Sequence, residues 1–96
     1  MQDYHEPPES LTSETRDIIS ALNSLKEEIE AVDWYQQRMD VTTDKQLKKI
    51  LRHNRNEEIE HACMALEWLR RNMDGWDEML KTYLFTEKEI TKVESE

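Results

Sequence analysis

Almost nothing in this chain would interrupt a helix. Its 96 residues include a single glycine, at position 75, and two prolines, which stand together at positions 7 and 8. Glycine and proline are the strongest local signals that a helix ends, and the long stretch between these positions has neither. Apolar side chains recur there at spacings of three and four, as one face of a helix requires. They are Ile18, Ala21, Leu22, Leu25, Ile29, Val32 and Tyr35 in the first stretch, and Leu47, Ile50, Leu51, Ala62, Ala65, Leu66 and Leu69 in the second.

These spacings predict two long helices joined by a short connection. Thr12 or Ser13 can cap the first helix, which reaches about Met39. A capping-box pattern that starts at Thr43 precedes the second helix, which reaches about Asn72. Because the connection is so short, the two helices must be antiparallel neighbours.

A shorter third helix and two irregular ends complete the predicted fold. Asp74 can cap the third helix, whose apolar residues run from Trp76 to Leu84. Residues 1–11, which contain the proline pair, are predicted to form an extended arm, and the charged residues 86–96 a mobile tail. The prediction is a single all-α domain that spans the whole chain: an antiparallel two-helix hairpin plus a short C-terminal helix.

The composition narrows the possible partners. Hydrophobic residues make up only 36% of the chain, and a two-helix hairpin leaves an apolar face exposed, which predicts self-association. The net charge of −9 argues against nucleic acid, and no apolar run approaches the roughly 20 residues of a membrane span. The polar, acidic N-terminus predicts no signal peptide. The single cysteine, Cys63, cannot form a disulfide within the chain, which favours a reducing compartment such as the cytoplasm. Cys63 points away from Glu58 around the helix, which indicates a packing residue rather than a ligand.

Two glutamates interrupt the apolar stripes of the predicted helices. Glu28 falls near the centre of the stripe on the first helix, and Glu58 near the centre of the stripe on the second. His61 follows Glu58 by three residues, which puts a carboxylate and an imidazole side by side. Such a pair alone is common in acidic helices, where it forms an ion pair or a solvated face. A carboxylate among apolar residues is costly unless it is paired or bound to a metal, so the matching Glu28 favours a metal site.

Together these three residues are half of a known ligand set. Carboxylate-bridged di-iron sites in four-helix bundles take one Glu from each of two helices and a Glu-x-x-His from each of the other two. Two chains related by a two-fold axis would supply the whole set, and the same dimer would cover the exposed apolar face. Carboxylates with an imidazole suit iron, manganese or zinc. The sequence therefore predicts a homodimer that forms a ferritin-like four-helix bundle with two irons between its chains.

Other candidate residues are less specific. Tyr35 lies on the apolar stripe, where it can donate a hydrogen bond to a ligand or serve as a core aromatic. Glu27 and Glu30 lie off the stripe and are expected to be exposed. Trp34 falls near these two glutamates, where it can pack against another subunit or flank an outer metal site. His53 is expected at the surface or at an interface rather than as a ligand.

The same segments resemble the encapsulated ferritins, the ferritin-like proteins associated with encapsulins. Residues 27–35, Glu-Glu-Ile-Glu-Ala-Val-Asp-Trp-Tyr, resemble the signature of their first helix. Residues 53–61 and 66–71 resemble their second helix, and residues 82–87 resemble the segment that closes their folded part. The match runs in order over nearly the whole chain with compatible spacing.

The resemblance implies a ferroxidase, an enzyme that oxidises Fe(II) to Fe(III) with dioxygen at a di-iron site between two subunits. The implied iron ligands are Glu28, Glu58 and His61 of each subunit, with Tyr35 close by as a further catalytic residue. The implied outer metal site, on the route by which iron arrives, is Glu27, Glu30 and Trp34.

The resemblance also implies a larger assembly. Dimers of this family build an open ring, commonly a decamer, which is held as cargo inside an encapsulin nanocompartment where the iron is stored. One feature departs from the family pattern: no clear cargo-loading peptide follows Val93-Glu94-Ser95-Glu96.

Two other functions fit the same scaffold. A rubrerythrin-like peroxidase would oxidise iron with peroxide rather than with dioxygen. A non-catalytic helical adaptor would bind a partner through its acidic stripe, and metal would then neither stabilise its dimer nor turn over.

Overall fold

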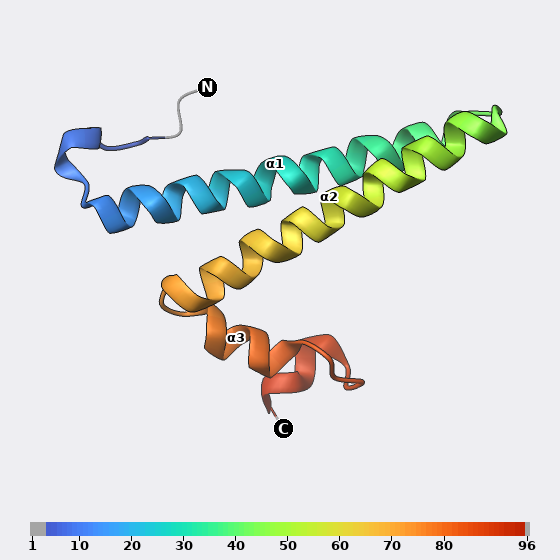
Figure 1. Ribbon diagram of the computed structural model, residues 1–96. Helices are drawn as coiled ribbons and strands as arrows, with labels where there is room; N and C mark the ends of the chain where they lie inside the picture. The colour runs from blue at the N-terminus through green and yellow to red at the C-terminus, as the bar shows by residue number, and fades with distance from the viewer. Residues whose placement is uncertain (1–3, 96) are drawn as a thin grey trace.

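The computed structural model describes residues 4–95, which are helical almost throughout. Two long helices, α1 (Ser13–Val41) and α2 (Lys45–Asn72), pack against each other as an antiparallel hairpin, and α3 (Trp76–Tyr83) turns away from it (Figure 1). Two short 3₁₀ helices, η1 (Pro8–Ser10) and η2 (Ile90–Ser95), lie before and after them. This part of the chain contains no strand, so the predicted all-α hairpin with a short third helix is confirmed.

The caps of the two long helices are threonine and aspartate. Thr12 caps α1, as one of the two predicted candidates, because its Oγ1 accepts a hydrogen bond from the Thr15 backbone N–H at 3.1 Å. The cap of α2 is Asp44, whose Oδ1 accepts from the Leu47 N–H at 2.8 Å. The prediction of Thr43 was wrong by one residue. A carboxylate at this position is also favoured by the positive end of the helix dipole.

The third helix begins without a side-chain cap. Its N-cap residue is Gly75, with φ of +102°, a backbone conformation that glycine adopts far more readily than other residues. The predicted cap, Asp74, is wrong by one residue, because the helix begins at Trp76 and its cap position is Gly75. Asp77 and Glu78 in the first turn instead favour this helix through its dipole.

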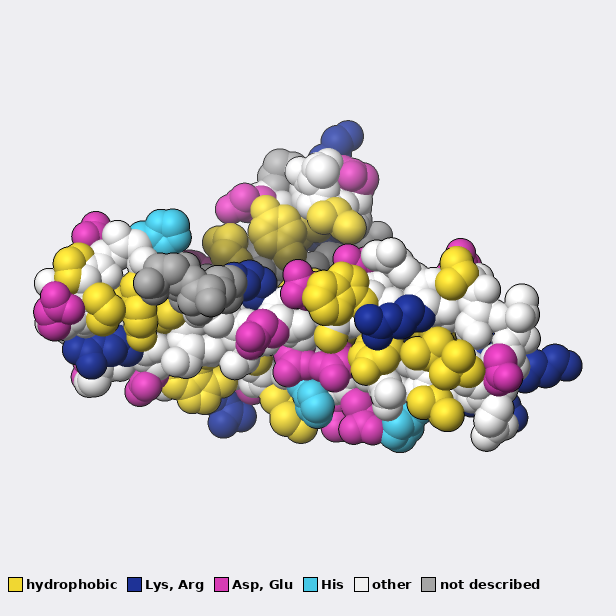
Figure 2. Space-filling view, turned by 90° about the horizontal axis from the view of Figure 1, so that it is seen from above, with side chains coloured by type: hydrophobic (Ala, Val, Ile, Leu, Met, Phe, Trp, Pro, Cys, Tyr) yellow, Lys and Arg dark blue, Asp and Glu magenta, His cyan; other side chains and the backbone are white. Residues whose placement is uncertain are grey.

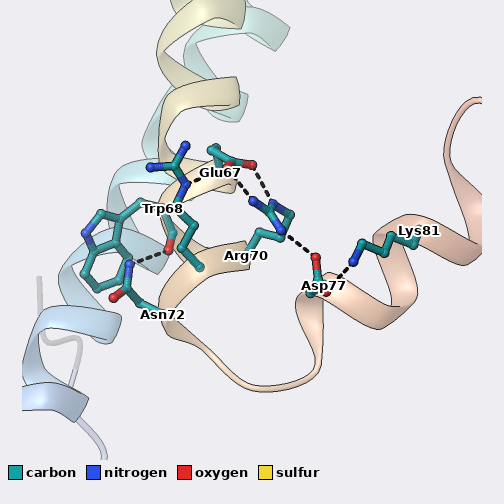
Figure 3. A network of polar contacts seen from close by, with 7 residues as sticks. Glu67, Trp68, Arg70, Asn72, Asp77 and Lys81 are labelled. Atoms are coloured by element: carbon teal, nitrogen blue, oxygen red, sulfur yellow. Dashed lines mark hydrogen bonds and ion pairs between the residues drawn. The ribbon is translucent and has the colours of Figure 1, made fainter.

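An ion-pair network connects α3 to α2 (Figure 3). Arg70 donates two hydrogen bonds of 2.7 Å to Glu67 and one of 2.5 Å to Asp77 on α3. Arg71 also donates to Glu67, at 2.6 Å, and Lys81 pairs with Asp77 at 3.0 Å. The hydrogen bonds from Arg70 and Arg71 lower the pKa of Glu67 to about 2. Those from Lys81 and Arg70 likewise lower the pKa of Asp77.

Within residues 4–95, the segments before α1 and after α3 are more regular than predicted, while residues 1–3 and 96 lie outside the described part. The extended arm includes the 3₁₀ turn η1, and the segment expected as a mobile tail contains η2. Val93 in η2 is buried, and the Tyr83 hydroxyl donates a 3.1 Å hydrogen bond to the Glu94 carboxylate. This bond also raises the pKa of Tyr83. These contacts give the tail a definite conformation, while its mobility stays a prediction.

The hydrophobic core of a single chain is small. Among the described residues, the buried hydrophobic side chains are Met39, Leu51, Leu69 and Val93. Many large hydrophobic side chains are exposed instead: Ile29, Trp34, Val41, Leu47, Ile50, Ile59, Met64, Trp68, Met79, Leu84, Phe85 and Ile90. Each helix of a hairpin can bury only the stripe that faces the other, so the predicted exposed apolar surface is confirmed. In residues 4–95, no helix is long and apolar enough to cross a membrane.

Candidate metal centre

The middle of α1 holds a carboxylate that is largely removed from water. Glu28 lies one turn from both Leu25 and Val32, which are themselves partly buried, and its side chain is 24% exposed. Its Oε2 atom is buried, and no hydrogen-bond donor in the described part of the chain satisfies it. A buried carboxylate oxygen without a donor is unfavourable, so this position needs a cation or another partner.

Helix α2 brings a second carboxylate and an imidazole to the same place. Glu58 is as buried as Glu28, whereas His61 is about half exposed. The His61 Nδ1 atom lies 3.5 Å from the Glu28 Oε2 and 3.7 Å from the Glu58 Oε2. These are ion-pair distances. The imidazole does not, however, have hydrogen-bond geometry towards Glu28, which is why that oxygen remains unsatisfied.

These three side chains fit a metal ion. Each offers one donor atom, and the three atoms lie within 4.8 Å of one another. No other trio of His, Cys, Asp or Glu in the described residues meets this condition. Two carboxylates and an imidazole are a suitable donor set for Fe²⁺ and similar ions. Figure 2 shows acidic side chains beside a histidine near the middle of the molecule.

One chain provides only part of a coordination shell. Three donors are fewer than an iron ion in such a site requires, and His61 still faces solvent on one side. The group is therefore open to further ligands on its solvent side.

The remaining sequence candidates lie outside this trio. Tyr35 is partly buried, and the Arg38 guanidinium lies 5.4 Å from the centre of its ring, a cation–π contact. Glu27 and Glu30 are exposed, as predicted, and Trp34 is 50% exposed. Their functional roles, and that of Tyr35, stay predictions.

The structure shows the surroundings of His53 and Cys63, whose roles the sequence left open. His53 is exposed and pairs with Glu57 one turn further along α2, so its predicted surface position is confirmed. Cys63 is also exposed, and it lines an apolar groove rather than the core. Cys63 is not among the three side chains of the metal centre, and its packing role stays a prediction.

The sequence patterns did not reveal the role of Arg70 in connecting α2 to α3. The spacing of Glu67 with Arg70 and Arg71 does signal pairing along one helix. Contact with Asp77, in contrast, depends on the direction of α3, which no local spacing determines.

The fold and the trio together define a class of protein. An antiparallel helical hairpin with Glu on one helix and Glu-x-x-His on the other has the pattern found in one half of ferritin-like carboxylate bundles. The crystal structure of protein ne0167 from Nitrosomonas europaea has the same fold, with a TM-score of 0.89 and 55% identity. The match covers 93% of this chain and 98% of that one.

Sequence comparison gives the family. The EncFtn-like family model matches residues 3–87, so the chain belongs to the EncFtn-like family. It is 66% identical over 93 residues to the "Ferritin-like protein" of Thermotoga maritima, covering 97% of this chain and 82% of that one. It is 58% identical over 91 residues to the "Encapsulated ferritin-like protein" of Rhodospirillum rubrum, covering 95% of this chain and 65% of that one. The chain thus spans just under two thirds of the length of the Rhodospirillum relative. The family match confirms the resemblance to the encapsulated ferritins that the sequence analysis identified.

Proposed function

We propose that the protein is a ferroxidase whose catalytic centre forms between two chains. Each chain contributes Glu28, Glu58 and His61, and two Fe²⁺ ions bind as substrate at the dimer interface. The observation that carries this proposal is the buried Glu28 Oε2 without a donor, next to Glu58 and His61. A cation satisfies that oxygen, and a second chain completes the ligand set.

The roles of the residues follow from their chemistry. Two adjacent irons deliver two electrons together to one dioxygen, which a single Fe²⁺ cannot do. Glu28 and Glu58 offset the positive charge that grows as Fe²⁺ becomes Fe³⁺. His61 adds a neutral nitrogen donor and fixes the geometry. We place Tyr35 close to the irons as a hydrogen-bond donor.

Iron arrives along an acidic surface. The net charge of −9 raises the local concentration of Fe²⁺ near the protein. We assign an outer metal site on this route to three residues of α1, of which the two carboxylates are exposed and the indole half exposed. They are Glu27, Glu30 and Trp34.

The proposed setting is an encapsulin nanocompartment in the cytoplasm. The Rhodospirillum relative is named an encapsulated ferritin-like protein, which supports a shell protein as partner. The dimers assemble further into a ring, commonly a decamer in proteins that this chain resembles. The Fe³⁺ product passes to mineral stored within the shell.

The test is Fe²⁺ oxidation in air, followed by absorbance, with the assembly state measured on the same samples. Glu58→Ala is the critical variant. Glu60→Ala is its matched control, because it removes an exposed carboxylate from the same helix two residues away. Wild type and Glu60→Ala should oxidise iron rapidly, and Glu58→Ala no faster than buffer.

Three results would contradict the proposal. Wild-type oxidation at the rate of buffer, with assembled protein, would leave a structural or adaptor hairpin. Faster oxidation with peroxide than with dioxygen would favour a peroxidase. Full activity in an assembled Glu58→Ala protein would remove Glu58 from the centre.

A further inference from the structure

Arg55 on α2 reaches across the hairpin to α1. Its side chain is partly buried, and its Nη1 donates a 2.8 Å hydrogen bond to the Gln36 Oε1 on α1. Its Nε and Nη2 both donate to the Asn56 Oδ1 on α2, at 3.2 and 2.8 Å. Because a guanidinium is planar and rigid, these three bonds fix its direction as well as its distance from α1. Arg55 therefore connects one point on α2 to one point on α1.

This connection lies close to the metal centre along both helices. Arg55 precedes Glu58 by three residues, which is about 4.5 Å along the axis of α2. Gln36 follows Glu28 by eight residues, which is about 12 Å along the axis of α1. A helix is stiff over two or three turns, so this bond limits how far the carboxylates on the two helices can slide past each other.

Apolar packing alone gives the hairpin a less exact register. Apolar side chains from both helices line the hairpin beside the metal centre, among them Leu25, Val32 and Leu66. Attraction between apolar side chains has no direction, so it tolerates a small shift of one helix along the other. A shift by one residue is about 1.5 Å, whereas a binding group has to be held to within about 0.5 Å. A directional bond near the centre adds the precision that its three donor atoms need.

The acceptors that hold Arg55 are amides. The cations of the α2–α3 network are bound by carboxylates, whereas Arg55 is bound by the amide oxygens of Gln36 and Asn56. A carboxylate this near the metal centre would be a further charged ligand that competes for the cation, and an amide oxygen is a weaker, uncharged one. Neutral acceptors therefore hold Arg55 without drawing metal away from the centre.

We propose that Arg55 is a positioning residue for the metal centre, and that it acts through its bond to Gln36. The bond sets the register in which the carboxylate of α1 meets the carboxylate and the imidazole of α2. A guanidinium has no acceptor atom for a cation, so the effect of Arg55 passes through the two helices. This role rests on the proposed function only in requiring that the trio binds a metal, and it does not depend on iron oxidation.

The test is a double-mutant cycle that is followed by Co²⁺ binding. Co²⁺ takes the same kinds of ligand as Fe²⁺, and its visible absorption spectrum reports the geometry of those ligands. Arg55→Met removes the donors, Gln36→Leu removes the acceptor, and the double variant removes both. Arg52→Met is the matched control, because Arg52 is an exposed arginine one turn earlier on the same helix. Circular dichroism and light scattering check the fold and the assembly state of each sample.

The expected result has two parts. Each single variant should bind Co²⁺ about tenfold more weakly than wild type, with a changed spectrum of the bound ion, because the three donor atoms no longer meet at the same distances. The double variant should bind no more weakly than either single variant, since both residues act through one bond. Arg52→Met should match wild type. A role limited to stability would lower the melting temperature and leave the spectrum unchanged.

Several outcomes would overturn this role for Arg55. Wild-type affinity and spectrum in both single variants would do so, as would losses of affinity that multiply in the double variant. If Arg55→Met does not fold, Gln36→Leu alone decides, because it leaves the arginine in place. A wild type that binds no Co²⁺ would remove the metal centre and this role together. Failure of the ferroxidase proposal alone would differ: wild type would bind Co²⁺ but oxidise Fe²⁺ no faster than buffer.

Discussion

The molecule places carboxylates in two contrasting settings. At the junction of α2 and α3, Glu67 and Asp77 accept hydrogen bonds from surrounding cations, and the pKa of each is lowered. At the middle of the hairpin, Glu28 is more buried, yet one of its oxygens has no donor at all. A satisfied network serves to hold two helices together. A more buried carboxylate with an unsatisfied oxygen is suited to binding a ligand, because a ligand can supply the partner that the fold does not.

The largest expected effect is on iron chemistry at the unsatisfied site. Glu28→Gln should lower the rate of Fe²⁺ oxidation by on the order of 100-fold, because an amide is a weaker, uncharged ligand. The same change should raise the thermal stability of the metal-free protein, since it removes a charged carboxylate with a buried oxygen that accepts no hydrogen bond. Absorbance and calorimetry measure the two effects. A Glu28→Gln protein that is less stable without metal would show that the carboxylate is already satisfied in solution.

The next effect concerns the satisfied network. Arg70→Ala should speed amide hydrogen exchange in α3 by a factor of about five, because it removes the charged side chain that connects α2 to α3. Arg71→Ala is the matched control, since Arg71 contacts Glu67 but its interactions do not extend to Asp77. Exchange in α1 should be unchanged in both variants. Equal exchange rates of α3 in the two variants would mean that the ion pairs do not hold this helix.

The smallest expected effect is the pH dependence of stability. The pKa of Glu67 is lowered in the folded chain from 4.5 to about 2, so its stabilising contribution is present above pH about 4.5. It is lost as the pH falls towards about 2, because protonation then breaks the hydrogen bonds from arginine. Urea midpoints measured across this window should fall less steeply for Glu67→Gln than for wild type. Parallel curves for the two proteins would exclude Glu67 as a source of acid sensitivity.

Much of the fold could be read from the helical repeat. The repeat predicted both long helices and the short third one, and the structure confirms them. The errors lie at the starts of α2 and α3. The observed cap residues, Asp44 and Gly75, each lie one residue after the predicted ones. Sequence patterns identify a cluster of capping residues, but the residue that caps is selected by where the backbone leaves its helical conformation.

The functional features also include one that the sequence predicted and one that it did not. The trio of Glu28, Glu58 and His61 was predictable because a helical repeat fixes which residues share a face. The hydrogen bond from Arg55 to Gln36 was not, because it joins two helices and depends on how far one is shifted along the other.

The sequence by itself determined two antiparallel helices, the stripe on each, and the acidic and imidazole groups at the centre of those stripes. It could do so because period, short connections and charge are local properties of the chain. Only the tertiary structure decided that an oxygen of Glu28 has no donor, that Arg70 connects α2 to α3, and that Phe85 stands exposed beside an apolar groove. These features depend on distances and angles between segments far apart in the sequence, which only packing determines.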